Sequence, residues 1–269
     1  MLRIVTGARI LGLLVVVAAA FAANWMLTSS VFKLDQAQVS GEVRYTDVQA
    51  VLAAAGIGAA DHPNVALLHG DEMRRKMLTF PAIADAQVDV QLPNHVSVTL
   101  TERQPVFALR RGTSLILVDA DGLVLATADD PTLAALGVPV IEDDRTNPPV
   151  PIAVSGSIDP IELAAMLELG GLTPAAIDSA AASLALSVRD DDGFVLSAQP
   201  TGWQAIFGNY TPNLRPTDII PRQVQCLRSL LGAGEAEVTT IYLAPLDERC
   251  GTYVPVATPR ETPTPAPAR

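Results

Sequence analysis

An uncharged apolar run near the N-terminus most constrains this chain. Residues 10–27 read ILGLLVVVAAAFAANWML and contain no charged side chain. At about 1.5 Å per residue, such a helix just crosses a hydrocarbon layer about 30 Å thick, so the run predicts a transmembrane helix. Arg3 and Arg9 precede it without an acidic residue. This predicts a short cytoplasmic tail over residues 1–9 and an extracytoplasmic location for everything after Ser30.

The same segment also permits a cleaved secretory signal. Residues 20–22, Ala-Phe-Ala, fit a small-x-small cleavage pattern behind an arginine-containing leader. The apolar run continues past that site to Leu27, which favours a retained anchor. Both interpretations place the rest of the chain outside the cytoplasm.

Residues 31–103 predict a small domain with the order strand, helix, helix, strand, strand. A strand-like stretch runs over 31–41, and a helix begins near Thr46, which forms a capping box with Gln49. Apolar residues at 48, 51, 52 and 55 share one face of that helix. Asp71 is the expected cap of a second helix, which ends before Pro81.

A hairpin closes this domain. Apolar and polar residues alternate over 85–92 and again over 96–101, with Pro93 and Asn94 between them. Alternation with one polar face is typical of an antiparallel strand pair that packs on an apolar layer, here the two helices.

Four motifs in this order resemble a POTRA domain of the FtsQ type, from the FtsQ/DivIB family of bacterial cell-division proteins. They are VSG at 39–41, FPAIADAQV at 80–88, LP at 92–93 and TERQPV at 101–106. Glu102 and Arg103, in the last motif, are interpreted as a polar junction between two domains and not as a catalytic pair.

Residues 104–256 predict a second, strand-rich domain. A helix capped by Asp159 with Pro160 in its first turn spans about 159–169, and further helices are expected over 175–182 and 219–231. Strands are expected at 115–118, 123–125, 136–141, 184–188, 194–196, 204–207 and 238–243, with a short edge piece at 253–256. The predicted class is α+β, with helices on one face of a mostly antiparallel sheet, which resembles the β-rich domain of FtsQ. Residues 257–269, rich in proline and threonine, predict a disordered tail.

Composition and motifs argue against several kinds of chemistry. The net charge of −11 disfavours binding to nucleic acid, and aromatic residues are only 4% of the 269, which disfavours a carbohydrate-binding module. The sequence has no phosphate loop, no nucleophile elbow and no clustered metal ligands, so no cofactor, metal or enzymatic activity is expected. Cys226 and Cys250 permit either a disulfide or two unlinked thiols.

The resemblance implies a scaffold at the division site that binds FtsB/DivIC-like and FtsL-like membrane proteins and helps to position and regulate septal peptidoglycan synthesis. It places the contact at the end of the β-rich domain. The matching positions are Tyr242, Gly251, Thr252, Tyr253 and Val254. A Cys226–Cys250 bond would tie the last long helix to this edge. The alternatives are a POTRA-containing secretion or envelope-assembly component and a membrane-anchored envelope hydrolase.

Overall fold

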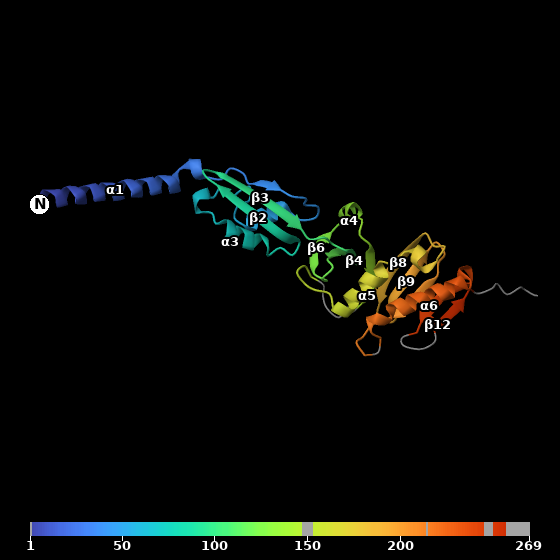
Figure 1. Ribbon diagram of the computed structural model, residues 1–269. Coiled ribbons are helices and arrows are strands. Elements are labelled where there is room, and N and C mark those ends of the chain that lie inside the picture. Colours follow the sequence, from blue (N-terminus) through green and yellow to red (C-terminus); the bar gives the residue numbers. More distant parts are fainter. Residues whose placement is uncertain (1, 147–152, 214, 245–249, 257–269) are drawn as a thin grey trace, which may run out of the picture. The chain divides into compact units, whose positions relative to one another are not determined.

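The computed structural model describes residues 2–146, 153–213, 215–244 and 250–256. The chain divides into two compact units, Met1–Gln104 and Pro105–Arg269 (Figure 1). The predicted tail at 257–269 lies outside the described residues.

The first unit begins with the long apolar helix α1 (Leu2–Thr28). Its segment Arg9–Thr28 is apolar and is not covered by the rest of the described chain, so its length and composition suit a membrane span and equally a signal sequence. The strand expected from residue 31 is wrong at its start. A 3-10 turn, η1 (Ser30–Phe32), stands there because the Ser29 hydroxyl accepts the Val31 N–H, and the strand β1 is only Gln38–Ser40.

The rest of this unit confirms the predicted order of elements. After β1 come α2 (Val48–Ala54), the 3-10 turn η2 (Val65–Leu67), α3 (Gly70–Met77), β2 (Ile83–Gln91) and β3 (His95–Glu102). The sheet order is β1-β3-β2, with β3 antiparallel to β2 and parallel to β1. Buried side chains from both helices meet those of the sheet, among them Val51, Met77, Val98 and Leu100.

Both predicted helix caps in this unit are wrong. Asp47 caps α2: its carboxylate accepts the N–H groups of Gln49 and Ala50 at 3.0 and 3.3 Å. Thr46 lies one residue earlier, and its own N–H is bound by Glu102. The helix α3 begins at Gly70 without a side-chain cap, so Asp71 lies in its first turn. A carboxylate there still interacts favourably with the helix dipole.

The second unit is built on one nine-stranded sheet. Its strands are β4 (Phe107–Arg111), β5 (Ser114–Val118), β6 (Val124–Ala128), β7 (Val140–Asp143), β8 (Ser183–Arg189), β9 (Gly193–Gln199), β10 (Gln204–Gly208), β11 (Val238–Leu243) and β12 (Gly251–Pro255). Their order in space is β12-β11-β10-β9-β8-β7-β4-β5-β6. The pairs β10–β11, β4–β7 and β7–β8 are parallel and the other neighbours antiparallel, which confirms the α+β class.

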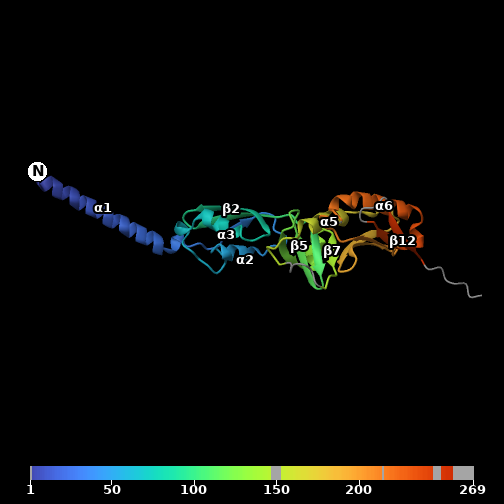
Figure 2. The ribbon, with the colours of Figure 1, turned by 90° about the horizontal axis from the view of Figure 1, so that it is seen from below.

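Helices α5 (Pro160–Gly170) and α6 (Ile220–Gly232) lie along the same side of this sheet (Figure 2). Their buried residues Met166, Leu169 and Leu227 join Trp203 and Phe207 in the large core of the unit. Three 3-10 turns complete the described elements: η3 (Pro174–Ile177), η4 (Thr217–Ile219) and η5 (Glu235–Glu237).

Three sequence predictions in this unit need correction. Strand β4 was not predicted. The strand expected over 136–141 is wrong for most of its length. Asp129 caps a helix, α4 (Asp130–Leu136), which ends at Gly137 with φ +66°. Strand β7 begins only at Val140. The helix expected over 175–182 is the short turn η3, because Asp178 takes a left-handed conformation that ends it.

Candidate partner-binding edge

The site expected at the end of the chain is the terminal strand of the large sheet. Strand β12 pairs antiparallel with β11, with Thr252 opposite Tyr242 and Tyr253 opposite Ile241. Nothing in the described part of the chain forms a further strand on its other side. A terminal strand offers unpaired N–H and C=O groups to a second chain.

The hydrogen-bond pattern shows which groups face the open side. Ala244 donates its N–H to the Cys250 carbonyl at 3.4 Å, and Val256 donates its N–H to the Glu237 carbonyl at 2.8 Å. The backbone N–H and C=O groups of the even-numbered residues in this segment therefore point toward β11. Backbone groups of an antiparallel strand alternate in direction. The N–H and C=O of Tyr253 therefore point to the open side. Pro255 points the same way and has no N–H to offer.

Apolar side chains accompany this edge. Tyr242, Tyr253, Val254 and Val256 are each about half exposed, at 48%, 52%, 47% and 49%. Tyr242 and Thr252 stand on one face of the sheet, and Tyr253 stands on the other, beside Ile241. The structure thus brings together all five residues that the sequence pointed to, on two adjacent strands. Exposed apolar side chains next to a free edge are a surface that an added strand can cover.

Gly251 lets β12 begin beside β11. Its φ is +141°, and a Cβ at this position would lie well inside contact distance of the Tyr242 carbonyl oxygen. Only glycine fits without displacing the backbone.

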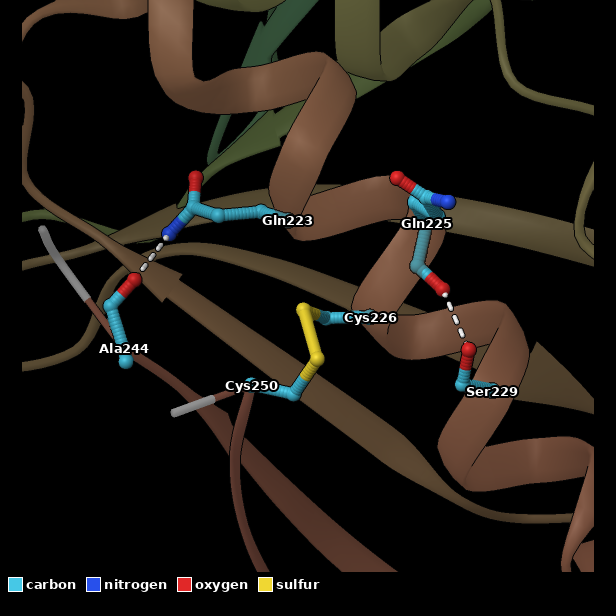
Figure 3. Close-up of a disulfide and its surroundings, with 6 residues drawn as sticks. All are labelled: Gln223, Gln225, Cys226, Ser229, Ala244 and Cys250. Carbon is cyan, nitrogen blue, oxygen red and sulfur yellow. Dashed lines mark hydrogen bonds between the residues drawn. A yellow bond between two sulfur atoms is a disulfide. The ribbon is translucent and has the colours of Figure 1, made fainter. Parts of the chain in front are cut away.

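A disulfide joins α6 to this edge. Cys226 in α6 is bonded to Cys250, directly before β12, with their Cα atoms 5.0 Å apart (Figure 3). Gln223, one turn earlier in α6, is 3% exposed and contacts the carbonyl of Ala244, directly after β11. Sequence reasoning missed Gln223, since a buried glutamine has no signature apart from its place on the apolar face of α6.

The opposite edge of the sheet is different. Val124 at the start of β6 donates to the Gly156 carbonyl at 2.9 Å and accepts from Ser155 at 3.0 Å, and Leu123 pairs with Ser157. The chain's own segment 155–157 thus occupies the start of that edge. Strand β12 is the more accessible of the two ends.

Glu102 makes its polar contacts within the first unit. It is 7% exposed, and its carboxylate accepts the N–H groups of Arg44, Tyr45 and Thr46 at 2.8, 3.3 and 2.8 Å. It therefore anchors the segment before α2 to the end of β3, inside the first unit. In sequence, Glu102 lies just before the boundary between the two units, which falls after Gln104.

A cluster of charged side chains in the second unit, Arg111, Asp143, Arg145 and Glu162, holds elements of that unit together. Asp143, with 0% of its side chain exposed, accepts from Arg111 and from Arg145 Nε at 2.9 Å, and Arg145 reaches Glu162 of α5 at 2.7 Å. Burial raises the pKa of the Asp143 carboxyl, but the hydrogen bonds from the two arginines outweigh it and hold that pKa below its usual range. The cluster ties β4, β7 and α5 together. Among the described residues no group of three or more His, Cys, Asp or Glu could hold a metal ion.

Comparison with known proteins agrees with this architecture. The family described as POTRA domain, FtsQ-type, matches residues 32–103. The chain is 30% identical over 115 residues to the cell division protein FtsQ of Agrobacterium fabrum (43% of this chain, 35% of the relative). It is 31% identical over 115 residues to FtsQ of Streptomyces griseus (42% and 52%), and 28% identical over 182 residues to FtsQ of Chloroflexus aggregans (65% and 61%).

These matches cover between about a third and three fifths of the relatives' own lengths. The longest match, over 182 residues, is longer than the first unit and therefore reaches into the strand-rich unit. With the apolar N-terminal helix, the matches indicate a membrane-anchored division protein. The chain carries a POTRA domain of the FtsQ type, and its similarity to several cell division proteins FtsQ supports the FtsQ/DivIB family of bacterial cell-division proteins.

Proposed function

We propose that this protein is a non-enzymatic scaffold of the division site, which binds FtsB/DivIC-like and FtsL-like membrane proteins and through them positions and regulates septal peptidoglycan synthesis. Its N-terminus lies in the cytoplasm and both folded units lie outside. The single observation that carries the proposal is the exposed terminal strand β12, with half-exposed Tyr242, Tyr253 and Val254 around it.

The chemistry of this edge favours binding over catalysis. A partner strand laid against β12 would pair with the outward N–H and C=O of Tyr253, and its side chains would cover apolar groups on both faces. Main-chain hydrogen bonds supply affinity in this mode, and side chains on alternate positions supply specificity. Away from this edge, the charged side chains of the Asp143 cluster form ion pairs with one another, which is typical of a structural role.

The binding mode is tested with a proline substitution. Tyr253→Pro removes the outward N–H, whereas the inward bonds of β12 to β11 come from its even-numbered residues. Edge strands tolerate proline when the lost N–H faces away from the sheet. We expect Tyr253→Pro to weaken binding of the host's FtsB/DivIC-like protein by at least about tenfold, which is about 1.4 kcal/mol.

Two controls separate backbone from side chain. Tyr253→Val keeps the N–H and removes the ring, so it should lose less affinity than Tyr253→Pro. Leu167→Ser alters an exposed apolar residue of α5, on the same unit but outside the edge, and should bind as the wild type does. Binding is measured with the full chain in nanodiscs. Equal affinity for Tyr253→Pro and wild type would exclude strand addition at β12.

Localisation tests the cellular part of the proposal. A fluorescent protein fused to the N-terminus should mark the division site in dividing cells. A chain ending after Leu243 should reach that site without recruiting the partners, because it lacks β12. A uniform envelope signal from a fusion that replaces the native protein would refute the assignment to division.

A further inference from the structure

We infer that helix α6 holds the β12 edge in its binding position through two side chains, Gln223 and the disulfide-bonded Cys226, so that partner binding depends on the disulfide. The inference rests on the proposed function for what the edge binds. The geometry of the clamp itself does not depend on any partner.

Gln223 fixes the end of β11. Its side-chain N–H group donates to the carbonyls of Ala244 and Phe207, each at 3.3 Å, and its oxygen accepts the Tyr210 hydroxyl at 2.8 Å. Gln223 is 3% exposed; its bonds to Phe207 and Tyr210 are buried, and its bond to Ala244 is partly buried. Only a group that both donates and accepts can serve these neighbours, which is what a neutral amide provides.

Cys226 fixes the start of β12. It stands three residues after Gln223, on the same face of α6, and its disulfide holds Cys250 directly before the strand (Figure 3). Ala244 also donates to the Cys250 carbonyl at 3.4 Å. The two α6 side chains therefore hold the two neighbouring residues at which β11 ends and β12 begins.

The edge needs such a clamp because burial holds it only weakly. From Thr252 to Pro255 every residue of β12 is exposed, and its one neighbouring strand is β11. Segments with few buried apolar contacts and exposed hydrogen bonds open at low free energy. A strand that opens cannot present the ordered backbone that an added strand requires. The disulfide replaces the packing that β12 lacks.

Hydrogen exchange on the full chain in nanodiscs tests the clamp without a partner. Dithiothreitol supplies two electrons and two protons, becomes its cyclic disulfide, and leaves Cys226 and Cys250 as thiols. We expect exchange at the inward amides of Thr252 and Val254 to rise at least about tenfold on reduction, while β8 and β9 keep their protection. The paired substitution Cys226→Ala with Cys250→Ala should reproduce this under oxidising conditions, and Gln223→Leu should do so in part.

The matched control is Ser229→Ala. Ser229 is exposed on the same helix, and its hydroxyl donates to the Gln225 carbonyl at 3.1 Å within α6 (Figure 3). It should change neither exchange nor binding. With the host's FtsB/DivIC-like protein as probe, we expect the reduced chain and the Cys variant to bind at least about tenfold more weakly than the oxidised wild type.

The outcomes separate this inference from the proposed function. Unchanged exchange at Thr252 and Val254 after reduction would overturn the clamp. Loss of protection throughout β8 and β9 would also overturn it, because the disulfide would then be required for folding of the whole unit. Faster exchange with unchanged binding would overturn the dependence of binding on the disulfide. If the oxidised wild type bound no FtsB/DivIC-like probe, the proposed function would fail, while the exchange result would still decide on the clamp.

Discussion

Glu102 is expected to contribute strongly to the unfolding free energy of the POTRA unit through hydrogen bonds to its backbone. Its carboxylate is 7% exposed and accepts three backbone N–H groups, those of Arg44, Tyr45 and Thr46. Glu102→Ala would leave these three donors without their acceptor. Hydrogen bonds to charged groups contribute about 1.5–3 kcal/mol each. Water can reach the partly exposed segment 44–46, so about 1 kcal/mol per bond, or about 3 kcal/mol in total, is the expected loss of unfolding free energy.

Hydrogen exchange of β2 and β3 measures this loss in the full chain. Where these amides exchange through unfolding of the unit, about 3 kcal/mol corresponds to exchange about 100-fold faster. Glu102→Gln keeps the shape and one acceptor oxygen, so its effect should be smaller. The control Glu42→Gln changes a carboxylate with 86% of its side chain exposed that pairs with the same Arg44, and it should leave exchange unchanged.

The reasoning would be refuted if Glu102→Ala and Glu42→Gln exchanged at the same rate. That result would mean that water replaces the carboxylate at all three N–H groups without net loss. The high burial of Glu102 and its two 2.8 Å contacts argue against this.

Two further predictions follow from the second unit. Because the pKa of Asp143 is lowered in the folded state, this carboxylate adds stability above its unfolded pKa of about 3.9, and the stability is lost as the pH falls through the folded pKa. When acid unfolding is followed by Trp203 fluorescence, the stability of Asp143→Asn should therefore fall less steeply below about pH 4 than that of the wild type. An equally steep fall in both proteins would contradict the pairing of Asp143 with the arginines. Gly251→Ala should detach β12 and abolish partner binding, because the new Cβ would collide with the Tyr242 carbonyl, whereas Gly232→Ala meets open space and should bind normally. Binding and β12 exchange measure both variants, and normal binding by Gly251→Ala would contradict the position assigned to β12.

The sequence predicted most elements whose signal is local. The alternating residues of 85–101 gave the β2–β3 hairpin, and Asp159 with Pro160 gave the start of α5. The caps failed where a distant residue intervened: Thr46 could not act as predicted because Glu102, which follows it by 56 residues, binds its N–H. Strand β4 was missed because its sequence, FALRR, has no alternation, since Phe107, Ala108 and Leu109 are all buried.

For the candidate edge, the sequence and the family resemblance pointed to the residues, and the structure adds their arrangement. Tyr242 and Thr252 could be named from the chain, but their cross-strand pairing depends on the register that Gly251 allows. Gln223 could not be found in advance. Its role depends on three partners, at positions 207, 210 and 244, that only the folded unit brings together.

The short length of β12 has a consequence for how such an edge can work. The strand has five residues and ends at Pro255, so a partner gains few backbone hydrogen bonds there, each with a net contribution of only about 0.5–1.5 kcal/mol. The short length of β12 also has a benefit, because a long open edge would pair with other copies of the chain. Proposed partners that are themselves anchored in the membrane meet this edge at a raised effective concentration, which lets a weak contact be occupied. A clamped, short edge on a membrane-anchored chain therefore suits reversible assembly, and its affinity for a soluble partner fragment should be much weaker than for the same partner in the same bilayer.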